Sequence, residues 1–406
     1  MSSSHINAAT PVPSFADLGV PSELIKILEQ RRITVPLPVQ IVTFGEAVAG
    51  KDLAARAPTG SGKTLAFGLP MISRLSHDKM RSPTGLILAP TRELAAQISN
   101  ELSPLAVARN LRVQSFYGGV GFSAQLRSLR KGTDIAVACP GRLEDLMRSG
   151  RIQLGGVKMV VVDEADRMAD MGFLPAVRGI LDAIKEDHQT LLFSATLDND
   201  VKVIMDSYQH NPTYYEIDLD DESKRRITHQ FHIVEQAERT ALCAKLISAQ
   251  SSTVVFVRTK HGADRLAKQL SHQGINAAAI HGDLTQNQRE RALTAFRKGT
   301  VQTLVATDVA ARGVHVDDVG CVIHYDLPEN AKSYLHRSGR TARAGAKGTV
   351  VALVTPKQRA MAKNIKSTLK LNAEFIGDFS SRKPARKRDA LFVSATPRAQ
   401  LPGTPK

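Results

Sequence analysis

Short apolar runs rich in β-branched residues recur along the chain, with helix-like stretches between them. They occupy residues 86–89, 135–138, 160–162 and 191–193, and after residue 220 the rhythm restarts at 254–257, 277–280, 303–305, 321–323 and 350–354. Continuous apolar runs of this length are typical of strands buried on both faces, and alternation of strand with helix indicates parallel sheets. The pattern therefore predicts an α/β fold with two parallel sheets flanked by helices.

A change of pattern separates the two series of strands. Residues 216–228 have no apolar period and place acidic side chains beside basic ones, which is typical of a linker. We therefore predict an N-terminal domain at 1–215, the linker at 216–228, a C-terminal domain at 229–377 and a basic, disordered tail at 378–406. The total of 406 residues agrees with more than one domain.

Composition excludes several classes of protein. Hydrophobic residues make up 42% of the chain and charged residues 23%, so a mostly disordered or fibrous chain is excluded. No apolar run approaches the roughly 18 residues of a membrane span, and the N-terminus lacks the pattern of a secretory signal. Cys139, Cys243 and Cys321 lie far apart without a CxxC pair, which disfavours a disulfide framework and a zinc site. We expect a cytoplasmic protein with no membrane association.

The net charge of +15 is distributed unevenly. Residues 1–220 hold 23 basic and 24 acidic groups, residues 221–381 hold 24 and 14, and residues 382–406 hold 7 and 1. The basic excess therefore lies wholly in the second part of the chain. Binding of a polyanion such as a nucleic acid is the functional interpretation, and a merely solubilising surface is the alternative.

The strongest local motif is APTGSGKT at residues 57–64, which follows an apolar LAA and precedes a helix-like stretch. Glycines let backbone N–H groups turn toward phosphate oxygens, Lys63 supplies a point charge and Thr64 can ligate Mg²⁺. Ala57 stands where the general pattern has its first glycine, and a chance GSGKT turn is the alternative. We predict a phosphate cradle formed by Pro58, Thr59, Gly60, Ser61, Gly62, Lys63 and Thr64.

A run of acids follows a second predicted strand, in MVVVDEAD at residues 159–166. Asp163 can hold Mg²⁺ through water, and Glu164 can activate the attacking water. Acids after a strand more often form a helix cap or a solvated turn. Here Asp163 lies 99 residues after Thr64, as in a four- or five-strand sheet, so we favour the catalytic interpretation.

The DEAD spelling at 163–166, with further motifs in order across roughly residues 15–345, resembles the DEAD-box RNA helicases. The resemblance implies two RecA-like domains that bind ATP, Mg²⁺ and RNA across their cleft. It also implies ATP hydrolysis coupled to domain closure, local RNA unwinding and RNP remodelling. By this resemblance Phe15 and Gln40 select adenine, although Leu37 and Arg32 stand where the family usually has Thr and Gly.

The same resemblance assigns contacts to the RNA backbone and coupling roles. It assigns RNA binding to Arg92, Gly119, Arg142, Arg289 and Thr307, and coupling to Asp166, Ser194, Thr196 and His336. Cys139 replaces the usual Thr before Pro-Gly-Arg. Residues 119–124 also fit the dinucleotide fingerprint GxGxxA, but no acidic residue closes a βαβ unit about 20 positions later.

The last motif, at residues 334–345, supplies two cations for the nucleotide by resemblance. Arg340 and Arg343 would act as arginine fingers, because guanidinium groups neutralise charge that spreads over the transferring phosphoryl group. Gly313 is a further expected nucleotide contact. At the position of His315 the family typically has an Asp that contacts the ATP ribose.

Two rival functions remain open at this point. One is a DNA helicase or translocase built on the same two-domain ATPase, against which the DEAD spelling and Gln40 argue. The other is an RNA-annealing or scaffold protein with a vestigial ATPase, against which the intact Lys63 and Glu164 argue. We expect a monomer that binds RNA with little sequence specificity, with ribosomal or RNA-decay complexes as candidate partners.

Overall fold

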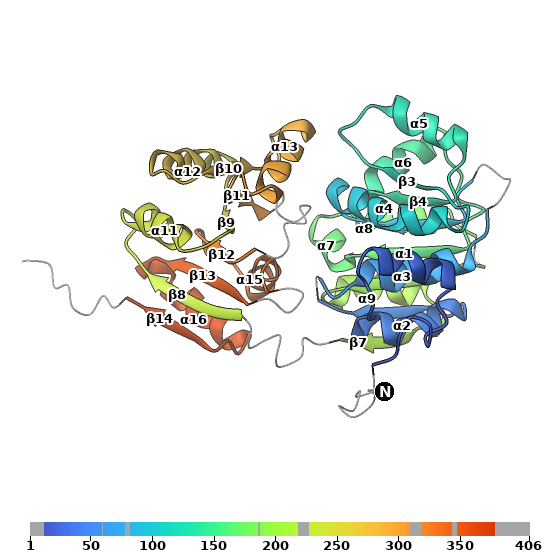
Figure 1. Cartoon of the computed structure of the whole chain (residues 1–406), viewed down its shortest axis with the longest axis horizontal. Helices are drawn as coiled ribbons and strands as arrows, with labels where there is room; N and C mark the ends of the chain where they lie inside the picture. The colour runs from blue at the N-terminus through green and yellow to red at the C-terminus, as the bar shows by residue number, and fades with distance from the viewer. Residues whose placement is uncertain are drawn as a thin grey trace, which may run out of the picture.

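Seven strands from the first part of the chain form one parallel sheet. The computed structural model describes residues 12–58, 60–77, 82–185, 187–217, 227–308, 319–342 and 347–377. The sheet order is β3-β4-β2-β5-β6-β1-β7 (Figure 1). Its strands are β1 (Leu53–Arg56), β2 (Gly85–Leu88), β3 (Val113–Phe116), β4 (Ile135–Ala138), β5 (Met159–Asp163), β6 (Gln189–Ser194) and β7 (Thr213–Glu216).

The second sheet repeats this order with the next seven strands, as β10-β11-β9-β12-β13-β8-β14. Its members are β8 (Ile227–Ile233), β9 (Thr253–Val257), β10 (Ala277–Ile280), β11 (Thr303–Thr307), β12 (Cys321–His324), β13 (Gly348–Val354) and β14 (Ala373–Ile376). We call residues 12–217 the N-terminal half and residues 227–377 the C-terminal half. In each half the first strand, β1 or β8, is inserted between the last two.

Helices cover both faces of each sheet. In the N-terminal half they are α1 (Ser22–Gln30), α2 (Pro38–Val48), α3 (Lys63–Arg74), α4 (Arg92–Val107), α5 (Phe122–Lys131), α6 (Pro140–Arg148), α7 (Ala165–Asp170), α8 (Leu174–Leu181) and α9 (Asn199–Tyr208). Successive strand residues point to opposite faces. Ile87 and Val161 therefore join one apolar core, while Leu88 and Val160 join the other.

The C-terminal half is built in the same way, with two apolar cores on either side of its sheet. Its helices are α11 (Arg239–Ser248), α12 (Lys260–His272), α13 (Gln286–Arg297), α15 (Ala331–Ser338), α16 (Arg359–Thr368) and the short 3₁₀ helix η1 (Pro356–Gln358). The two parallel sheets flanked by helices confirm the predicted fold class. No helix in the described ranges is long and apolar enough to cross a bilayer.

Four strands escape the search for continuous apolar runs, namely β3, β7, β8 and β14. The burial of β7 alternates between half-buried and exposed residues, and β8 carries His229, Gln230 and His232 among its seven residues. β7 ends at Glu216 and β8 begins at Ile227, so both strands extend into the range 216–228 that the sequence assigns to a linker. Residues 218–226 and the tail at 378–406 lie outside the described residues.

Candidate functional site

The segment 57–64, which we predict to be a phosphate cradle and call the P-loop, leads from β1 into α3 and is left-handed at two glycines. Gly60 and Gly62 have φ of +83° and +88°, values that residues with a side chain rarely adopt. A Cβ at position 62 would also lie 2.6 Å from Nε2 of Gln40 and from Cδ1 of Leu37. Gly62 caps α3, so the positive end of the helix dipole faces the loop.

Lys63, the first residue of α3, is folded back over this loop. Its side chain is buried, and Nζ donates hydrogen bonds to the carbonyl oxygens of Ala57 at 2.9 Å and Pro58 at 3.4 Å. The buried hydroxyl oxygen of Ser61 has no hydrogen-bond partner within the described part of the chain. The loop therefore presents a positive charge, a hydroxyl group and a helix N-terminus, which together suit an anionic phosphate.

The predicted acids stand at the end of β5, in the interior of the site. Asp163 is the last residue of the strand, and its Oδ1 accepts a hydrogen bond from the backbone N–H of Glu164 at 2.9 Å. Burial raises the pKa of Asp163 to about 7, and the negative charge of Glu164 adds to the rise while Lys63 opposes it. A cation beside Asp163 would favour its charged form.

Thr64 and Asp163 are the predicted Mg²⁺ residues, and they offer one hydroxyl and one carboxylate. This small oxygen set fits Mg²⁺, which keeps several of its own waters in protein sites. The described ranges contain no group of three or more His, Cys, Asp or Glu side chains that could hold a metal ion directly. A magnesium ion here would therefore be held largely through water and nucleotide phosphates.

Glu164 has a partner that the motif search missed. The backbone at Glu164 is left-handed, with φ of +51°, and this turn starts α7. Its carboxylate forms an ion pair with Arg167, whose side chain is 6% exposed against 10% for Glu164. Arg167 follows three positions later on the same helical turn. The i,i+3 spacing of the opposite charges of Glu164 and Arg167 is the sequence feature from which this ion pair could have been predicted.

Gln40 lies against the P-loop. Its amide Nε2 donates to the carbonyl of Gly62 at 3.0 Å, and its Oε1 accepts from the N–H of Leu37 at 2.9 Å. Nε2 keeps one further N–H and Oε1 keeps one further lone pair. The amide of Gln40 can therefore still form hydrogen bonds with the edge of a base. Phe15 and Gln40 are each 2% exposed, and Phe15 packs in the core of the N-terminal half.

The structure brings predicted residues from both halves around one small cavity. It is lined by Lys63, Glu164, Asp166, Arg167, Ala195, His336 and Arg340. Arg340 is buried and follows α15, the helix that carries His336. Thr59, Gly313 and Arg343 belong to the predicted site but lie outside the described residues.

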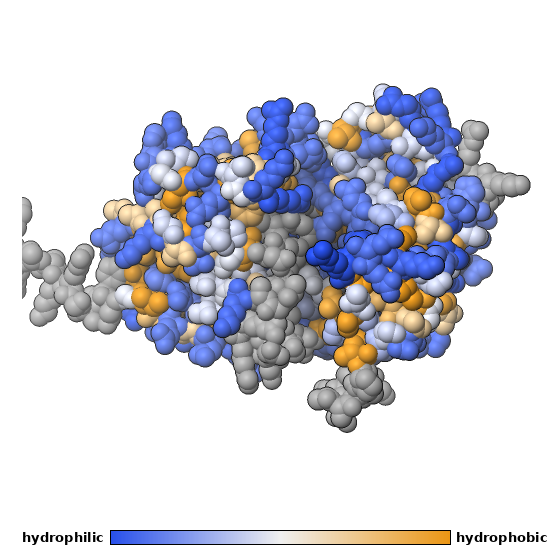
Figure 2. Space-filling model, in the orientation of Figure 1, coloured by the Kyte–Doolittle hydropathy of each residue, from blue (hydrophilic) through white to orange (hydrophobic). Residues whose placement is uncertain are grey.

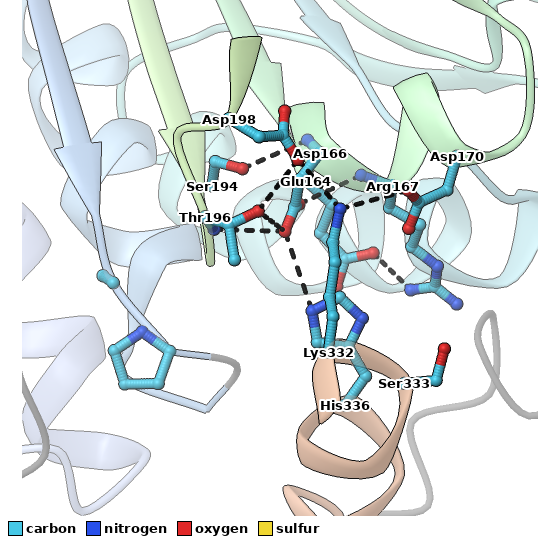
Figure 3. Close-up of polar contacts among 12 residues, drawn as sticks. Glu164, Asp166, Arg167, Asp170, Ser194, Thr196, Asp198, Lys332, Ser333 and His336 are labelled. Atoms are coloured by element: carbon cyan, nitrogen blue, oxygen red, sulfur yellow. Dashed lines mark hydrogen bonds and ion pairs between the residues drawn. The ribbon is translucent and has the colours of Figure 1, made fainter. Parts of the chain in front are cut away.

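Asp166 is the centre of a polar network at this cavity (Figure 3). Its backbone N–H donates to Oγ of Ser194 at 3.1 Å, and its Oδ2 accepts from both the N–H and the hydroxyl of Thr196 at 3.1 Å. The same Oδ2 lies 3.7 Å from Nε2 of His336 in the other half. Asp166 thus contacts the other three predicted coupling residues, Ser194 through its backbone N–H and Thr196 and His336 through its carboxylate.

Lys332 adds a second bridge between the halves, one helical turn before His336. Its Nζ lies 3.1 Å from Oδ1 of Asp170 and 3.0 Å from Oδ2 of Asp198 (Figure 3). Burial alone would lower the pKa of Lys332, but the hydrogen bonds to Asp198 and Asp170 and the negative charges of Asp170 and Asp166 raise it above the ordinary value. The sequence analysis assigned no role to Lys332, although its i,i+4 spacing from His336 puts both side chains on one face of α15.

The predicted RNA residues of the N-terminal half also come together. Gly119 has φ of +81°, and a Cβ there would lie 2.1 Å from Nη1 of Arg92. Arg142 donates to Oε1 of Gln125 at 2.9 Å, and its guanidinium carbon lies 4.2 Å from the centroid of the Phe122 ring. The three predicted contacts therefore stand at the starts of α4, α5 and α6.

Arg289 and Thr307 approach from the C-terminal half. Arg289, on α13, forms an ion pair with Glu93 at 2.9 Å, and the two side chains are 6% and 9% exposed. Burial lowers the pKa of Arg289, while the charge of Glu93 opposes that shift. Thr307 ends β11 and is buried. Glu93, next to Arg92 in the sequence, is a second residue that contacts the opposite half and that the sequence motifs did not identify.

Comparisons with known proteins agree with this arrangement. The family model for DEAD/DEAH box helicases matches residues 37–204, and the model for the helicase conserved C-terminal domain matches residues 237–345. The DEAD-box ATP-dependent RNA helicase CshA of Bacillus cereus is 38% identical over 359 residues, which cover 88% of this chain and 68% of the relative. The chloroplastic DEAD-box ATP-dependent RNA helicase 3B of Zea mays is 40% identical over 406 residues, covering 97% of this chain and 54% of that one.

A solved structure shares the arrangement of both halves. Dbp5 of S. cerevisiae bound to RNA and ADP BeF3 superposes with a TM-score of 0.80 at 27% sequence identity. The match covers 89% of this chain and 95% of that one. The two sheets of the present chain are thus similar in arrangement to those of a protein solved with both RNA and ADP BeF3 bound.

Proposed function

This chain belongs to the DEAD-box ATP-dependent RNA helicases, and on that premise we propose that ATP binding closes its two halves over RNA and unwinds it locally. The observation that carries the proposal is the Asp166 network. Its carboxylate contacts Thr196 in one half and lies 3.7 Å from His336 in the other. A nucleotide-dependent shift at the acid cluster would therefore reach both halves directly.

The nucleotide site is assigned from the chemistry of its residues. Lys63 and the P-loop backbone bind the phosphates, Gln40 and Phe15 select adenine, and Gly313 adds a further contact. Bound Mg²⁺, at Thr64 and Asp163, would neutralise phosphate charge. Glu164 orients and deprotonates the attacking water, and Arg340 with Arg343 stabilises the charge that develops on the phosphoryl group.

RNA binding is assigned to the surface where the starts of α4, α5 and α6 face α13. Arg92, Gly119, Arg142, Arg289 and Thr307 contact phosphates and sugars, so little sequence specificity follows. Phosphates that approach Arg289 would compete with Glu93 for the guanidinium group. Closure of the halves would bend the RNA backbone and separate a few base pairs.

The wider setting of the protein is a proposal of the same kind. We propose a monomer with the domain boundaries given above, acting on RNA and RNPs in the cytoplasm, with ribosomal or RNA-decay complexes as candidate partners. Cys139, Cys243 and Cys321 are free thiols, and burial raises the pKa of each to about 12, so they stay protonated and unreactive.

The test exchanges the proposed base. Glu164→Gln should lower RNA-stimulated ATP hydrolysis by at least about 100-fold, because the water loses its proton acceptor. Binding of RNA in the presence of ATP should persist, since the amide keeps the shape of the side chain. Glu29→Gln, the same exchange at an exposed position of α1, is the matched control.

The measurements are steady-state ATPase rates and fluorescence anisotropy of labelled RNA with and without ATP. If Glu164→Gln hydrolyses ATP at the wild-type rate, Glu164 is not the base that deprotonates the attacking water. Equal stimulation by single-stranded DNA would favour the DNA translocase. RNA annealing without any RNA-stimulated hydrolysis in the wild-type chain would favour the scaffold protein.

A further inference from the structure

Helix α5 presents a basic face that no role described above uses. Arg127, Arg130 and Lys131 are exposed and follow the i, i+3, i+4 spacing of one helix face, opposite the buried Gln125 and Leu129. The helix itself carries no acidic residue. The ion pairs within the described ranges involve none of these three cations. The positive charge of this face is therefore not neutralised by the described part of the protein.

An open groove lies at the C-terminal end of the same helix. It is lined by Arg112, Gln114, Ser128, Lys131 and Gly132. The guanidinium of Arg112, just before the edge strand β3, donates to the main-chain carbonyl oxygen of Lys131, which fixes this guanidinium at the C-terminal end of α5. Hydrophilic side chains cover the surface over α5 at the upper right of Figure 2. Two cations with neighbouring amide and hydroxyl groups are the chemistry that binds a phosphate.

The basic face is physically continuous with the RNA surface. Gly119 lies three positions before the start of α5, and Arg142 is anchored on its first turn through Gln125 and the ring of Phe122. Ten residues of α-helix span about 15 Å, enough for several nucleotides. A strand that leaves Gly119 and Arg142 outward therefore meets the cations of α5 next.

We propose that the basic face of α5, together with its groove, binds the phosphates of a single-stranded RNA flank that continues beyond the core RNA site. The proposal rests on the assignment of RNA binding to Gly119 and Arg142 made above. The contacts are electrostatic, so they raise the affinity for long RNAs independently of sequence. Continuity with the RNA surface favours RNA over an acidic protein as the occupant.

The experiment compares two variants on two RNAs. Arg127→Gln with Arg130→Gln removes two cations from the face, and Arg265→Gln with Lys268→Gln removes an exposed i,i+3 pair from α12 as a matched control. One labelled RNA spans only the core site, and the other carries single-stranded extensions at both ends. Affinities are measured by anisotropy of full-length protein over a series of salt concentrations.

The α5 variant should bind the short RNA as the wild type does and bind the extended RNA about tenfold more weakly at low salt. Its salt slope on the extended RNA should fall by about 1.4, since each lost contact to a single strand removes about 0.7. The α12 variant should change neither value. Wild-type ATPase rates at saturating short RNA would show that the α5 variant is folded.

An equal loss on both RNAs, or the same loss in the α12 variant, would overturn the proposal. An unchanged affinity and slope on the extended RNA would also overturn it and leave the face to an acidic protein partner. Failure of the wild-type chain to bind the short RNA would instead refute the RNA surface itself. The failures of the two proposals are therefore distinguishable.

Discussion

Each half of the chain places a cation at the first residue of the helix that follows its inserted strand. In the N-terminal half this is Lys63 on α3, and in the C-terminal half it is Arg239 on α11. A carboxylate stands nearby in both, Asp163 at the end of β5 and Asp326 two residues after β12. The shared strand order thus brings a cation and a carboxylate close enough to interact electrostatically in both halves.

The two pairs differ in what surrounds them. Arg239 bonds Oδ1 of Asp326 at 3.0 Å and lies 4.2 Å over the Tyr325 ring, so its charge is satisfied inside the half. Lys63 instead faces a loop whose cap residue, Gly62, is left-handed, whereas the equivalent cap, Glu238, has φ of −95°. One scaffold therefore supports a phosphate cradle where glycines open the loop, and a structural ion pair where they do not.

The largest expected effect separates the two cations by function. Lys63→Ala should lower ATP turnover by at least about 100-fold, because phosphates lose their charged donor in a buried site. Thermal stability should change little, since the hydrogen bonds of Lys63 within the described residues go to two carbonyl groups of the loop. ATPase assays and thermal melting measure the two quantities. Wild-type turnover would contradict the assignment of the P-loop.

The opposite result is expected for the second cation. Arg239→Met should lower the free energy of unfolding by about 2 to 3 kcal/mol, because Asp326 loses its partner in a partly buried position. ATP turnover per folded molecule should persist. Chemical denaturation measures the change, with Lys245→Met at an exposed position of α11 as the control. An unchanged unfolding free energy, or loss of turnover without loss of stability, would break the comparison.

A fall in pH should lower the stability of the C-terminal half and raise that of the N-terminal half, each by about 1 to 2 kcal/mol. Burial lowers the pKa of His229 to about 4, so protonation of the unfolded chain destabilises the C-terminal half as the pH falls from 6.5 toward 4. Burial raises the pKa of Asp163 to about 7, so the folded N-terminal half gains a proton and stability as the pH falls below 7.

Hydrogen exchange of the intact chain at pH 7 and pH 5, corrected for intrinsic rates, resolves these two responses. Amides of β8 and β12 should lose more protection than those of β1 and β5. His324 strengthens the expectation, because burial also lowers its pKa well below the ordinary value. A greater loss of protection in β1 and β5 than in β8 and β12 would show that the buried histidines do not determine how stability responds to acid.

The sequence was informative where a signal is local. Strands such as β5 and β9 are buried on both faces, so their apolar runs predict them directly. β7 and β8 carry polar residues because they lie toward an edge of their sheets, and the same criterion misses them. The P-loop and the acid cluster are likewise contiguous motifs, so their residues could be proposed from the sequence without knowledge of the fold.

Contacts between distant segments could not be predicted in this way. Arg289 and Glu93 are 196 positions apart, and Lys332 lies 162 positions from Asp170. Such pairs depend on how two sheets are placed relative to each other, which no periodicity in the chain records. The pairing of Arg239 with Asp326 also required the strand order, because it joins residues 87 positions apart.

The inserted position of β1 has a consequence for synthesis on the ribosome. β1 pairs with β6 and β7, in which Leu191 and Thr213 lie opposite Leu53. The strand therefore gains its two neighbours only after those later residues have been synthesised. No strand in the described part of the chain is shared between the sheets, and β7 ends at Glu216 before β8 begins. The nascent N-terminal half can therefore complete its ATP-binding scaffold while the C-terminal half is still being translated, and until then the P-loop strand has unpaired edges.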